Sequence, residues 1–447
     1  MKKRYFGTDG VRGIANNSPI TADIAQKIGI ATGLYLSNEA HQKRVVIAKD
    51  TRLSGYMLES ALTSGFTSVG MDVFLLGPMP TPAVSLLTKA LRADLGVMIS
   101  ASHNTYEYNG IKIFGSTGYK LNDSEEIEIE NIIQNIEQLD ISTKGIGKAK
   151  RIDDAQARYI EYVKGTIDRK LTFEGMKVVV DSANGAGYKV APQALWELGA
   201  EVVSIGDKPN GLNINHEYGS TSLKNIVDRV KKDKADIGIA LDGDADRVII
   251  IDEKGDIING DSLLAIIASE WQSLGKLLNN GVVTTTMSNI GLEEYFEEKK
   301  INLIRTDIGD RYVVEYMKEH GYNIGGEQSG HIIIGDYSTT GDGLLTAIQV
   351  LAIMKKYKKK ISELSDQMKV VPQILKNFKY DKAKNIDPLD IEEINKIGQL
   401  KIGNLGRILV RLSGTEPLIR VMGESRDKKH LNKTIDDIMQ IIKKKFN

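Results

Sequence analysis

Residues 235–242 (ADIGIALD) repeat the pattern of residues 93–100 (ADLGVMIS) earlier in the chain, and this repeat is the main indication of the fold. Both stretches are apolar through the centre and end on a polar side chain, as in a buried strand followed by a polar loop. Residues 322–325 (YNIG) occupy a comparable place further on. This repetition predicts three related units, although buried strands of unrelated units also resemble one another.

A strand, a helix and a second strand are predicted before each of these stretches. Such alternation predicts α/β layers through most of the chain. The predicted elements are strands at 44–48 and 72–76 around a helix at 55–69, strands at 177–180 and 201–205 around a helix at 188–198, and strands at 282–285 and 301–304 around a helix at 292–299.

The length and the polar tracts suggest where domains divide. A chain of 447 residues is long enough for three or four domains. The polar tract at 140–151 marks a first boundary, and the tract at 366–369 opens a last region of short strands with a C-terminal helix. The lysine-rich run at 355–360 is expected to end a helix, where cations interact favourably with the helix dipole.

The composition excludes several classes of protein. Lys plus Arg and Asp plus Glu both total 59, and this balance argues against a protein that coats nucleic acid or an anionic membrane. The absence of cysteine excludes disulfides and thiolate metal sites. The N-terminus lacks the apolar segment of a signal peptide, and the apolar stretch at 343–354 is too short to span a bilayer. We therefore expect a soluble, cytoplasmic protein.

Unusual polar loops follow the three repeated strands. They are SASHN at 100–104, DGDADR at 242–247 and GGEQSGH at 325–331. Ligands of α/β sheets gather beyond the carboxyl ends of the strands. The three loops are therefore expected to face one shared cleft.

The loop at 242–247 is the strongest chemical signal. Its carboxylates at positions i, i+2 and i+4 follow an apolar strand, where unpaired charges are costly, and a hard divalent cation such as magnesium or calcium would remove that cost. An EF-hand is the rival reading, with Glu253 at the twelfth loop position, but Arg247 stands where that loop needs glycine and residues 248–251 (VIII) indicate a strand. A solvated acidic turn is the plainer alternative.

The other motifs are weaker by themselves. The serines at 100–104 need an activating base or metal, and serine and asparagine are ordinary turn residues. The groups at 325–331 suit a polyhydroxylated ligand or a glycine-rich turn equally well. Residues 411–420 (RLSGTEPLIR) offer two guanidinium groups, two hydroxyls and a glycine turn for a phosphate, although a hairpin with surface arginines is the alternative. Residues 181–187 (DSANGAG) lack the spacing of a nucleotide fingerprint.

Taken together and in this order, the motifs resemble those of the α-D-phosphohexomutase superfamily over essentially the whole chain. Residues 6–13 (FGTDGVRG), Ala245 and Gln328 are most similar to the bacterial branch whose substrates are glucosamine phosphates. Glucose and mannose relatives usually have glycine and methionine at the last two positions.

The resemblance implies an α/β fold in which three related mixed α/β domains and a smaller C-terminal α+β domain surround a central cleft. The expected domains are 1–150 with the phosphoserine loop, 151–256 with the metal loop, 257–368 with the sugar-binding loop and 369–447 with the phosphate-binding loop.

The resemblance also implies the roles of individual residues. It selects Ser102, not Ser100, as the phosphoserine, and it leaves the general base open. The implied catalytic residues are Ser102, His103, Lys112, Arg247 and His331; the magnesium ligands are Asp242, Asp244, Asp246 and a phosphate oxygen on Ser102; and the substrate-binding residues are Glu327, Ser329, Arg411, Ser413, Gly414, Thr415 and Arg420.

The implied reaction interconverts glucosamine 6-phosphate and glucosamine 1-phosphate for UDP-N-acetylglucosamine and cell-wall synthesis. Phosphoserine, Mg²⁺ and glucosamine (or glucose) 1,6-bisphosphate are the implied reaction partners. A small phosphosugar is the expected ligand, neither nucleic acid nor membrane is expected as a partner, and a homodimer is one option.

Three rival functions and two departures accompany this expectation. The rivals are a glucose or mannose phosphomutase, a non-catalytic sugar-phosphate binding protein and a metal-dependent phosphatase. Thr105 and Leu412 stand where the family usually has proline, so both loops are expected to be less rigid. Neither change removes a functional atom, and activity is expected to survive.

Overall fold

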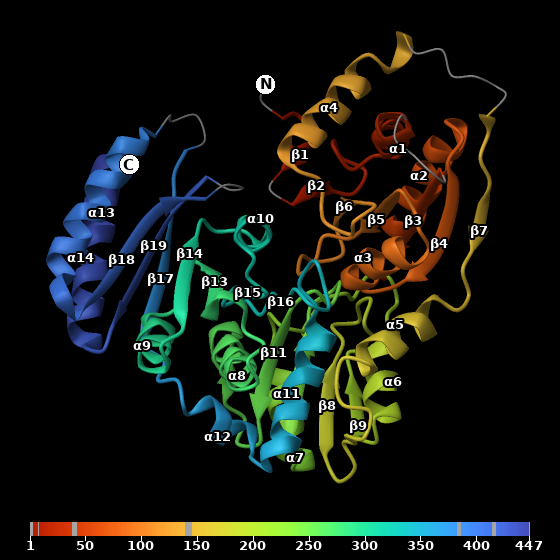
Figure 1. Cartoon of the computed structure of the whole chain (residues 1–447). Helices are drawn as coiled ribbons and strands as arrows, with labels where there is room; N and C mark the ends of the chain where they lie inside the picture. Colours follow the sequence, from red (N-terminus) through yellow and green to blue (C-terminus); the bar gives the residue numbers. More distant parts are fainter. Residues whose placement is uncertain are drawn as a thin grey trace. The chain divides into compact units, whose positions relative to one another are not determined.

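A computed structural model describes the chain in two compact units. Unit 1 comprises Met1–Thr286 and Ile301–Asp366, and unit 2 comprises Met287–Lys300 and Gln367–Asn447. Figure 1 shows the helices and strands of both units. The described residues are 3–7, 9–37, 43–138, 145–381, 386–413 and 417–446.

Among the described residues, the first sheet of unit 1 has seven strands, and four helices belong to the same part of the chain. The helix α1 (Ala22–Ser37) packs on α2 (Ser54–Ser68), and α3 (Thr81–Ala90) and α4 (Asp123–Gln134) follow. From edge to edge the strands are β1 (Phe6–Gly7), β2 (Gly10–Ile14), β6 (Tyr108–Gly115), β5 (Leu95–Ile99), β3 (Arg44–Lys49), β4 (Asp72–Pro78) and β7 (Ala149–Arg151).

The second sheet has five strands, and the helices α5 (Ala155–Lys164), α6 (Val190–Glu197) and α7 (Lys224–Asp233) belong to the same part of the chain. Its strands lie in the order β12 (Ile257–Ile258), β11 (Val248–Asp252), β10 (Ile237–Leu241), β8 (Lys177–Asp181) and β9 (Glu201–Ile205). The strand β11 confirms that residues 248–251 are not part of an EF-hand loop.

The third sheet completes unit 1. The lysine-rich run ends its helix, α11 (Gly343–Tyr357), as expected: the helix stops at Tyr357, and Lys358 takes a left-handed capping conformation. The strand order is β14 (Asn302–Thr306), β13 (Gly281–Thr285), β15 (Ile324–Gly326) and β16 (Ile332–Ile334), and the helices of this part are α8 (Gly260–Ser273), α10 (Asp310–His320), α11 (Gly343–Tyr357) and α12 (Ile361–Ser365).

The three sheets share one topological core, which confirms the repetition. In each, the first strand pairs in parallel with the second and the third, and the fourth strand pairs antiparallel to the third. The shared order is β6-β5-β3-β4, β11-β10-β8-β9 and β16-β15-β13-β14. The turn from third to fourth strand therefore occupies the same place three times, and each of the three polar loops lies in it.

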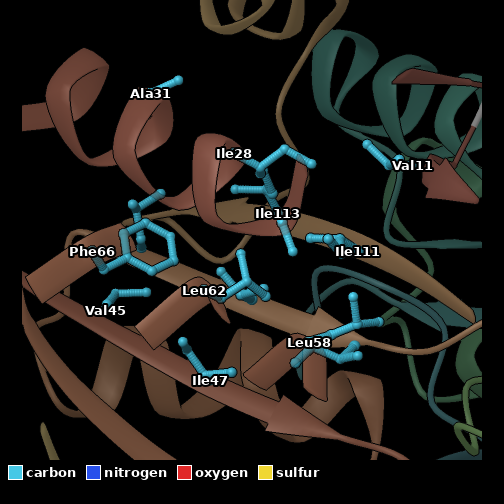
Figure 2. Packing of buried hydrophobic residues seen from close by; sticks show 14 of the residues in the cluster. Val11, Ile28, Ala31, Val45, Ile47, Leu58, Leu62, Phe66, Ile111 and Ile113 are labelled. Carbon is cyan, nitrogen blue, oxygen red and sulfur yellow. The ribbon is translucent and has the colours of Figure 1, made fainter. Parts of the chain in front are cut away.

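The core of the first sheet shows why the predicted elements form. Leu58, Leu62 and Phe66 recur on one face of α2 and gather with Val45 and Ile47 of β3 (Figure 2). All five side chains are fully buried, and their burial supplies the main driving force for this layer.

Two glycines let α1 and α2 cross closely. A Cβ atom on Gly65 would lie 2.3 Å from the carbonyl oxygen of Gln26, and one on Gly29 would lie 2.8 Å from that of Leu62. Backbones that approach this closely leave no room for a side chain, so the crossing requires glycine at both positions.

Unit 2 is a smaller α+β unit, as expected. Its antiparallel sheet lies against two helices that cover an apolar core (Figure 1). The strands lie in the order β17 (Gln373–Lys379), β19 (Leu418–Ser425) and β18 (Gly406–Leu412), and the helices are α9 (Ile290–Lys299), α13 (Pro388–Ile402) and α14 (Lys428–Phe446). Short 3₁₀ turns are η1 (Ile136–Gln138) and η3 (Leu278–Asn280) in unit 1 and η4 (Gly403–Leu405) in unit 2.

Within the described parts of the chain, no helix combines the length and the apolar character that crossing a membrane would require.

Candidate active site

Ser102 lies in the turn between β5 and β6, and its hydroxyl points to the aspartate loop. Its side chain is buried, and Oγ donates a hydrogen bond to Asp242 Oδ2 at 2.7 Å. Ser100 has a different task, because its Oγ accepts the backbone N–H of Ser102 at 2.9 Å. The two serines are therefore distinguished by geometry as well as by position.

The three carboxylates of the loop between β10 and β11 form one buried cluster. Asp242, Asp244 and Asp246 each offer an oxygen, and these oxygens lie within 4.8 Å of one another. Asp244 Oδ1 is buried and has no hydrogen-bond donor among the residues that the structure describes. Oxygen-only donors with such an unsatisfied atom fit a hard divalent cation.

Burial and mutual repulsion make the cluster electrostatically unbalanced. Burial, followed by the charges of Asp246 and Asp244, raises the pKa of Asp242 well above its ordinary value. Burial acts the same way on Asp246, but Lys112 and His331 outweigh it and lower the pKa of Asp246 well below the ordinary value. The protein neighbours of the cluster therefore stabilise the charged form of Asp246 but not that of Asp242.

Lys112 of β6 is the cation closest to the cluster. Its Nζ donates to Asp244 Oδ2 at 2.8 Å and to Asp246 Oδ2 at 3.2 Å. Burial alone would lower the pKa of Lys112, but the nearby carboxylates outweigh it and raise the pKa well above the ordinary value. Lys112 thus stays charged in the folded protein. Thr81, at the start of α3, adds a hydroxyl donor to Asp244 Oδ2 at 2.5 Å.

His103 and Arg247 lie together beside Ser102. His103 Nδ1 lies 3.4 Å from Ser102 Oγ and 3.2 Å from Arg247 Nη1. The His103 side chain retains an exposed surface, yet the surrounding protein displaces much of its water. This desolvation, followed by the charges of Arg247 and Arg12, lowers the pKa of His103 to about 4. The neutral ring can accept a hydrogen bond from the Arg247 guanidinium at Nδ1.

We expect His103 to titrate near pH 4, and Arg247→Met to raise that midpoint because it removes one of the opposing charges. NMR of protein with ¹³C-labelled histidine measures both midpoints, with His103→Gln to assign the signal. The unfolded chain takes up this proton near pH 6.5, so His103 contributes a loss of stability as the pH falls from 6.5 to about 4. A wild-type midpoint near 6.5 contradicts this electrostatic account.

His331 lies between the aspartate loop and α10. Its Nδ1 lies 3.6 Å from Asp246 Oδ1, its Nε2 lies 3.6 Å from Asp310 Oδ2, and Gly341 N donates to Nε2 at 3.0 Å. Burial alone would lower the pKa of His331, but the charges of Asp246 and Asp310 outweigh it and raise the pKa.

The loop between β15 and β16 presents two of the expected sugar-binding groups. Ser329 is exposed, and its Oγ donates to Glu327 Oε2 at 3.3 Å. Gln328 turns the other way, since its Nε2 donates to Asp261 Oδ2 at the start of α8 at 3.2 Å. Glu327 and Ser329 thus remain available for a ligand while Gln328 anchors the loop.

Unit 2 contains the predicted phosphate-binding segment. Arg411 of β18 and Arg420 of β19 are direct cross-strand partners. Burial, followed by the charge of Arg420, lowers the pKa of Arg411, so this pair of like charges would be relieved by an anion. The backbone N–H of Ser413 donates to Leu418 O at 2.8 Å, whereas Gly414 and Thr415 lie outside the described residues.

Several residues at the site were missed by the sequence analysis. Asp9 lies 3.4 Å from Lys112 Nζ and pairs with Arg12 and Lys120. Asp9 stands within residues 6–13, which were noticed only for their resemblance. Arg52 was not predicted either, because polar loops were expected at the ends of the third strands only, whereas Arg52 follows the first strand, β3.

The glycine-containing segment at 181–187 has a structural role. The N–H of Ala186 donates to Gly243 O at 2.8 Å, and a Cβ on Gly185 would lie 2.3 Å from that oxygen. The segment therefore packs directly against the backbone of the aspartate loop and supports it.

The two departures from the family pattern differ in their surroundings. Thr105 is exposed in the turn after Ser102. Leu412 is partly buried and packs against the apolar core of unit 2.

Models of the phosphoglucomutase/phosphomannomutase family match four consecutive parts of the chain. The alpha/beta/alpha domain I matches residues 3–140, domain II residues 157–255, domain III residues 259–371 and the C-terminal domain residues 356–441. These matches confirm the expected fold class of three α/β domains and a C-terminal domain.

A curated relative extends the match over nearly the full length. The phosphoglucosamine mutase of Parvibaculum lavamentivorans is 54% identical over 443 residues, which covers 99% of both chains. The chain belongs to the phosphoglucosamine mutase family. That family is part of the phosphoglucomutase/phosphomannomutase superfamily, and its enzymes are isomerases of the intramolecular phosphotransferase type. The expected resemblance is thereby confirmed.

Two solved structures are similar to the chain as a whole. A phosphoglucomutase/phosphomannomutase family protein of Burkholderia thailandensis has a TM-score of 0.84 at 25% identity, with 98% of this chain and 96% of that one covered. The N-acetylphosphoglucosamine mutase of Aspergillus fumigatus, solved in complex with GlcNAc-6P and magnesium, shares the fold with a TM-score of 0.67 at 18% identity, and the match covers 100% of this chain and 96% of that one.

Proposed function

We propose that this chain interconverts glucosamine 6-phosphate and glucosamine 1-phosphate through phosphorylated Ser102 and a 1,6-bisphosphate. The observation that carries the proposal is the hydrogen bond of 2.7 Å from Ser102 Oγ to Asp242 Oδ2, within a buried cluster of three carboxylates. Phosphoryl transfer needs positioning and charge neutralisation more than covalent help from the protein. The family relationship supports the choice of an amino sugar.

In the forward direction, phosphorylated Ser102 transfers its phosphoryl group to O1 of glucosamine 6-phosphate. The bond between phosphorus and Oγ breaks, the bond between phosphorus and O1 forms, and Oγ takes up a proton as the hydroxyl loses one to a basic side chain. After the bisphosphate turns, O6 returns its phosphoryl group to Ser102 in the same way. The cycle consumes no water, and Ser102 ends phosphorylated.

The cationic side chains beside Ser102 fit this chemistry. Lys112 and Arg247 are charged and can hold the oxygens of the transferring group. His103 lies beside Ser102, and His331 lies beside Asp246. Magnesium, held by Asp242, Asp244, Asp246 and an oxygen of the phosphorylated Ser102, would supply further neutralisation of the phosphoryl charge.

The sugar and its other phosphate need separate contacts. We assign Glu327 and Ser329 to the sugar hydroxyls, since a carboxylate and a hydroxyl both bond to such groups. We assign the second phosphate to the arginine pair of unit 2 and its turn, namely Arg411, Ser413, Gly414, Thr415 and Arg420. The four domains would then contribute one loop each, over 1–150, 151–256, 257–368 and 369–447.

The family also suggests the cellular setting. We propose that the enzyme works in the cytoplasm on a small phosphosugar, with glucosamine (or glucose) 1,6-bisphosphate as activator. A homodimer is part of the proposal, and sedimentation of the purified chain tests it.

The substrate assay tests the function directly. With Mg²⁺ and the matching 1,6-bisphosphate, we expect kcat/KM for glucosamine 6-phosphate to exceed that for glucose 6-phosphate or mannose 6-phosphate by at least about tenfold, since a charged amino group offers a contact that a hydroxyl does not. A preference for glucose or mannose overturns the choice of sugar. Release of inorganic phosphate faster than isomer formation identifies a phosphatase, and binding without turnover identifies a binding protein.

A further inference from the structure

Two side chains from distant parts of unit 1 hold the backbone of the Ser102 turn by hydrogen bonds. They are Arg52 and Asn215, called the gripping residues below. Arg52 Nη2 donates to Ser102 O at 3.2 Å and to Asn104 O at 2.6 Å. Asn215 Nδ2 donates to the same two oxygens, at 2.8 Å each. Arg52 follows β3 and Asn215 lies between β9 and α7. The two side chains therefore belong to the first and the second of the three repeated α/β units within unit 1.

The turn needs such support because Ser102 has an unfavourable backbone conformation. Its φ is +52°, in the left-handed region that residues with a Cβ atom seldom occupy. Conformations of this kind persist when the surrounding structure holds them in place. The direction of Ser102 Oγ toward Asp242 depends on this backbone, so the gripping donors also set the position of the hydroxyl.

Both gripping residues are themselves fixed. Arg52 is fully buried and ion-paired with Asp50, and its Nη1 lies 3.4 Å from Ser100 Oγ. Asn215 is 8% exposed, and its backbone N–H donates to Ala183 O at 2.8 Å. Two anchored donors can hold a loop more firmly than flexible surface groups can.

The same carbonyl oxygen also touches the aspartate loop. A Cβ atom on Gly243 would lie 2.5 Å from Ser102 O and 2.7 Å from Asn215 Nδ2. The serine turn, the Asn215 amide and the aspartate loop are therefore packed against one another without space for a side chain.

We propose that Arg52 and Asn215 are positioning residues that hold the Ser102 turn in register with the aspartate loop throughout the reaction. The inference rests on the proposed function of Ser102 as phosphoryl carrier. Neither side chain needs to touch the substrate. A rigid carrier suits the reaction, because the bisphosphate must turn between two transfers while Ser102 remains in place.

Asn215 gives the cleaner test, because truncation of Arg52 would leave the buried Asp50 without its partner. Asn215→Ala removes the two donated hydrogen bonds. Asn215→Asp keeps nearly the same volume but directs an acceptor at two carbonyl oxygens. If donation is what matters, kcat falls about 10- to 100-fold in Asn215→Ala and further in Asn215→Asp, while KM for glucosamine 6-phosphate changes less than about threefold.

Asn323→Ala is the matched control. Asn323 is also a buried asparagine of unit 1, and its Nδ2 donates to Lys276 O and to Asp336 Oδ1, both at 3.0 Å. Asn323→Ala deletes the same side-chain amide group as Asn215→Ala, but at a place away from the serine turn. We expect kcat of Asn323→Ala to stay within about twofold of the wild type, because the hydrogen bonds that it loses share no partner with the Ser102 turn.

Hydrogen-exchange mass spectrometry provides a readout that does not depend on turnover. In Asn215→Ala and in Arg52→Lys, the peptide covering residues 98–108 should exchange faster, whereas peptides from the core of β3 should not. If folded Asn215→Ala keeps wild-type kcat and wild-type exchange in this peptide, the inference is wrong. If the wild type itself lacks mutase activity but the exchange responds as expected, the proposed function fails while the grip on the turn stands.

Discussion

Ser102→Ala is expected to lose phosphoserine and nearly all mutase activity. The substitution deletes only Oγ, the atom that would carry the phosphoryl group, and such a loss of a nucleophile costs on the order of 10⁴-fold in kcat or more. Intact-mass analysis after incubation with the bisphosphate should show one added phosphoryl group in the wild type and none in the variant.

Ser100→Ala is the matched control for this result. Its hydroxyl accepts the N–H of Ser102, so its loss costs about 1 kcal/mol of stability but leaves the proposed acceptor atom in place. We expect Ser100→Ala to be phosphorylated. Full turnover by Ser102→Ala, or phosphate found on Ser100 instead, would show that the carrier has been assigned to the wrong residue.

Asp242→Asn is expected to abolish the response to Mg²⁺ and to lower kcat on the order of 10²–10³-fold. The amide is nearly isosteric: its oxygen can still accept the N–H of Arg247, and its nitrogen can donate to Ser102 Oγ, where the carboxylate now accepts. The fold should therefore survive while one of the three charged ligands is lost. Thermal unfolding with and without Mg²⁺ measures this, since a cation that binds only the folded state raises the transition temperature.

The metal-free proteins offer a further check. The pKa of Asp242 is raised in the folded state by burial and by Asp246 and Asp244. An acid with a raised folded-state pKa costs nothing below its ordinary pKa near 3.8, and its cost grows as the pH rises above that value. At neutral pH without metal, Asp242→Asn should thus be at least as stable as the wild type. A variant that is markedly less stable, or that still gains stability from Mg²⁺, contradicts the assignment of Asp242 as a ligand.

The elements of the fold were predictable because their signals are local. The apolar runs 235–242 and 93–100 gave β10 and β5 to within two residues at each end, and the apolar spacing in α2 matched its buried face. The aspartate motif was equally readable, because three carboxylates after a buried strand are chemically costly wherever the strand is placed. These signals lie within short segments, so they can be recognised in a single sequence.

The positions of the gripping residues could not be found in this way. Arg52 and Asn215 are ordinary polar residues in loops, and nothing in their own neighbourhood indicates that both donate to Ser102 O. Asp9, which directly precedes β2, likewise meets Lys112 of the neighbouring strand β6. Such contacts join segments far apart in the sequence, and they exist only after the sheets and their loops have packed.

Burial patterns and desolvation costs act within short segments, so the three repeated α/β units, the polar loops after their third strands and the chemistry of the aspartate motif can be read from the amino-acid sequence alone. The tertiary structure decided the left-handed turn at Ser102, the choice of Ser102 Oγ as the hydroxyl that meets Asp242, and the neutral His103 beside Arg247. Those features depend on how closely distant charges and donors approach, and only packing sets these distances.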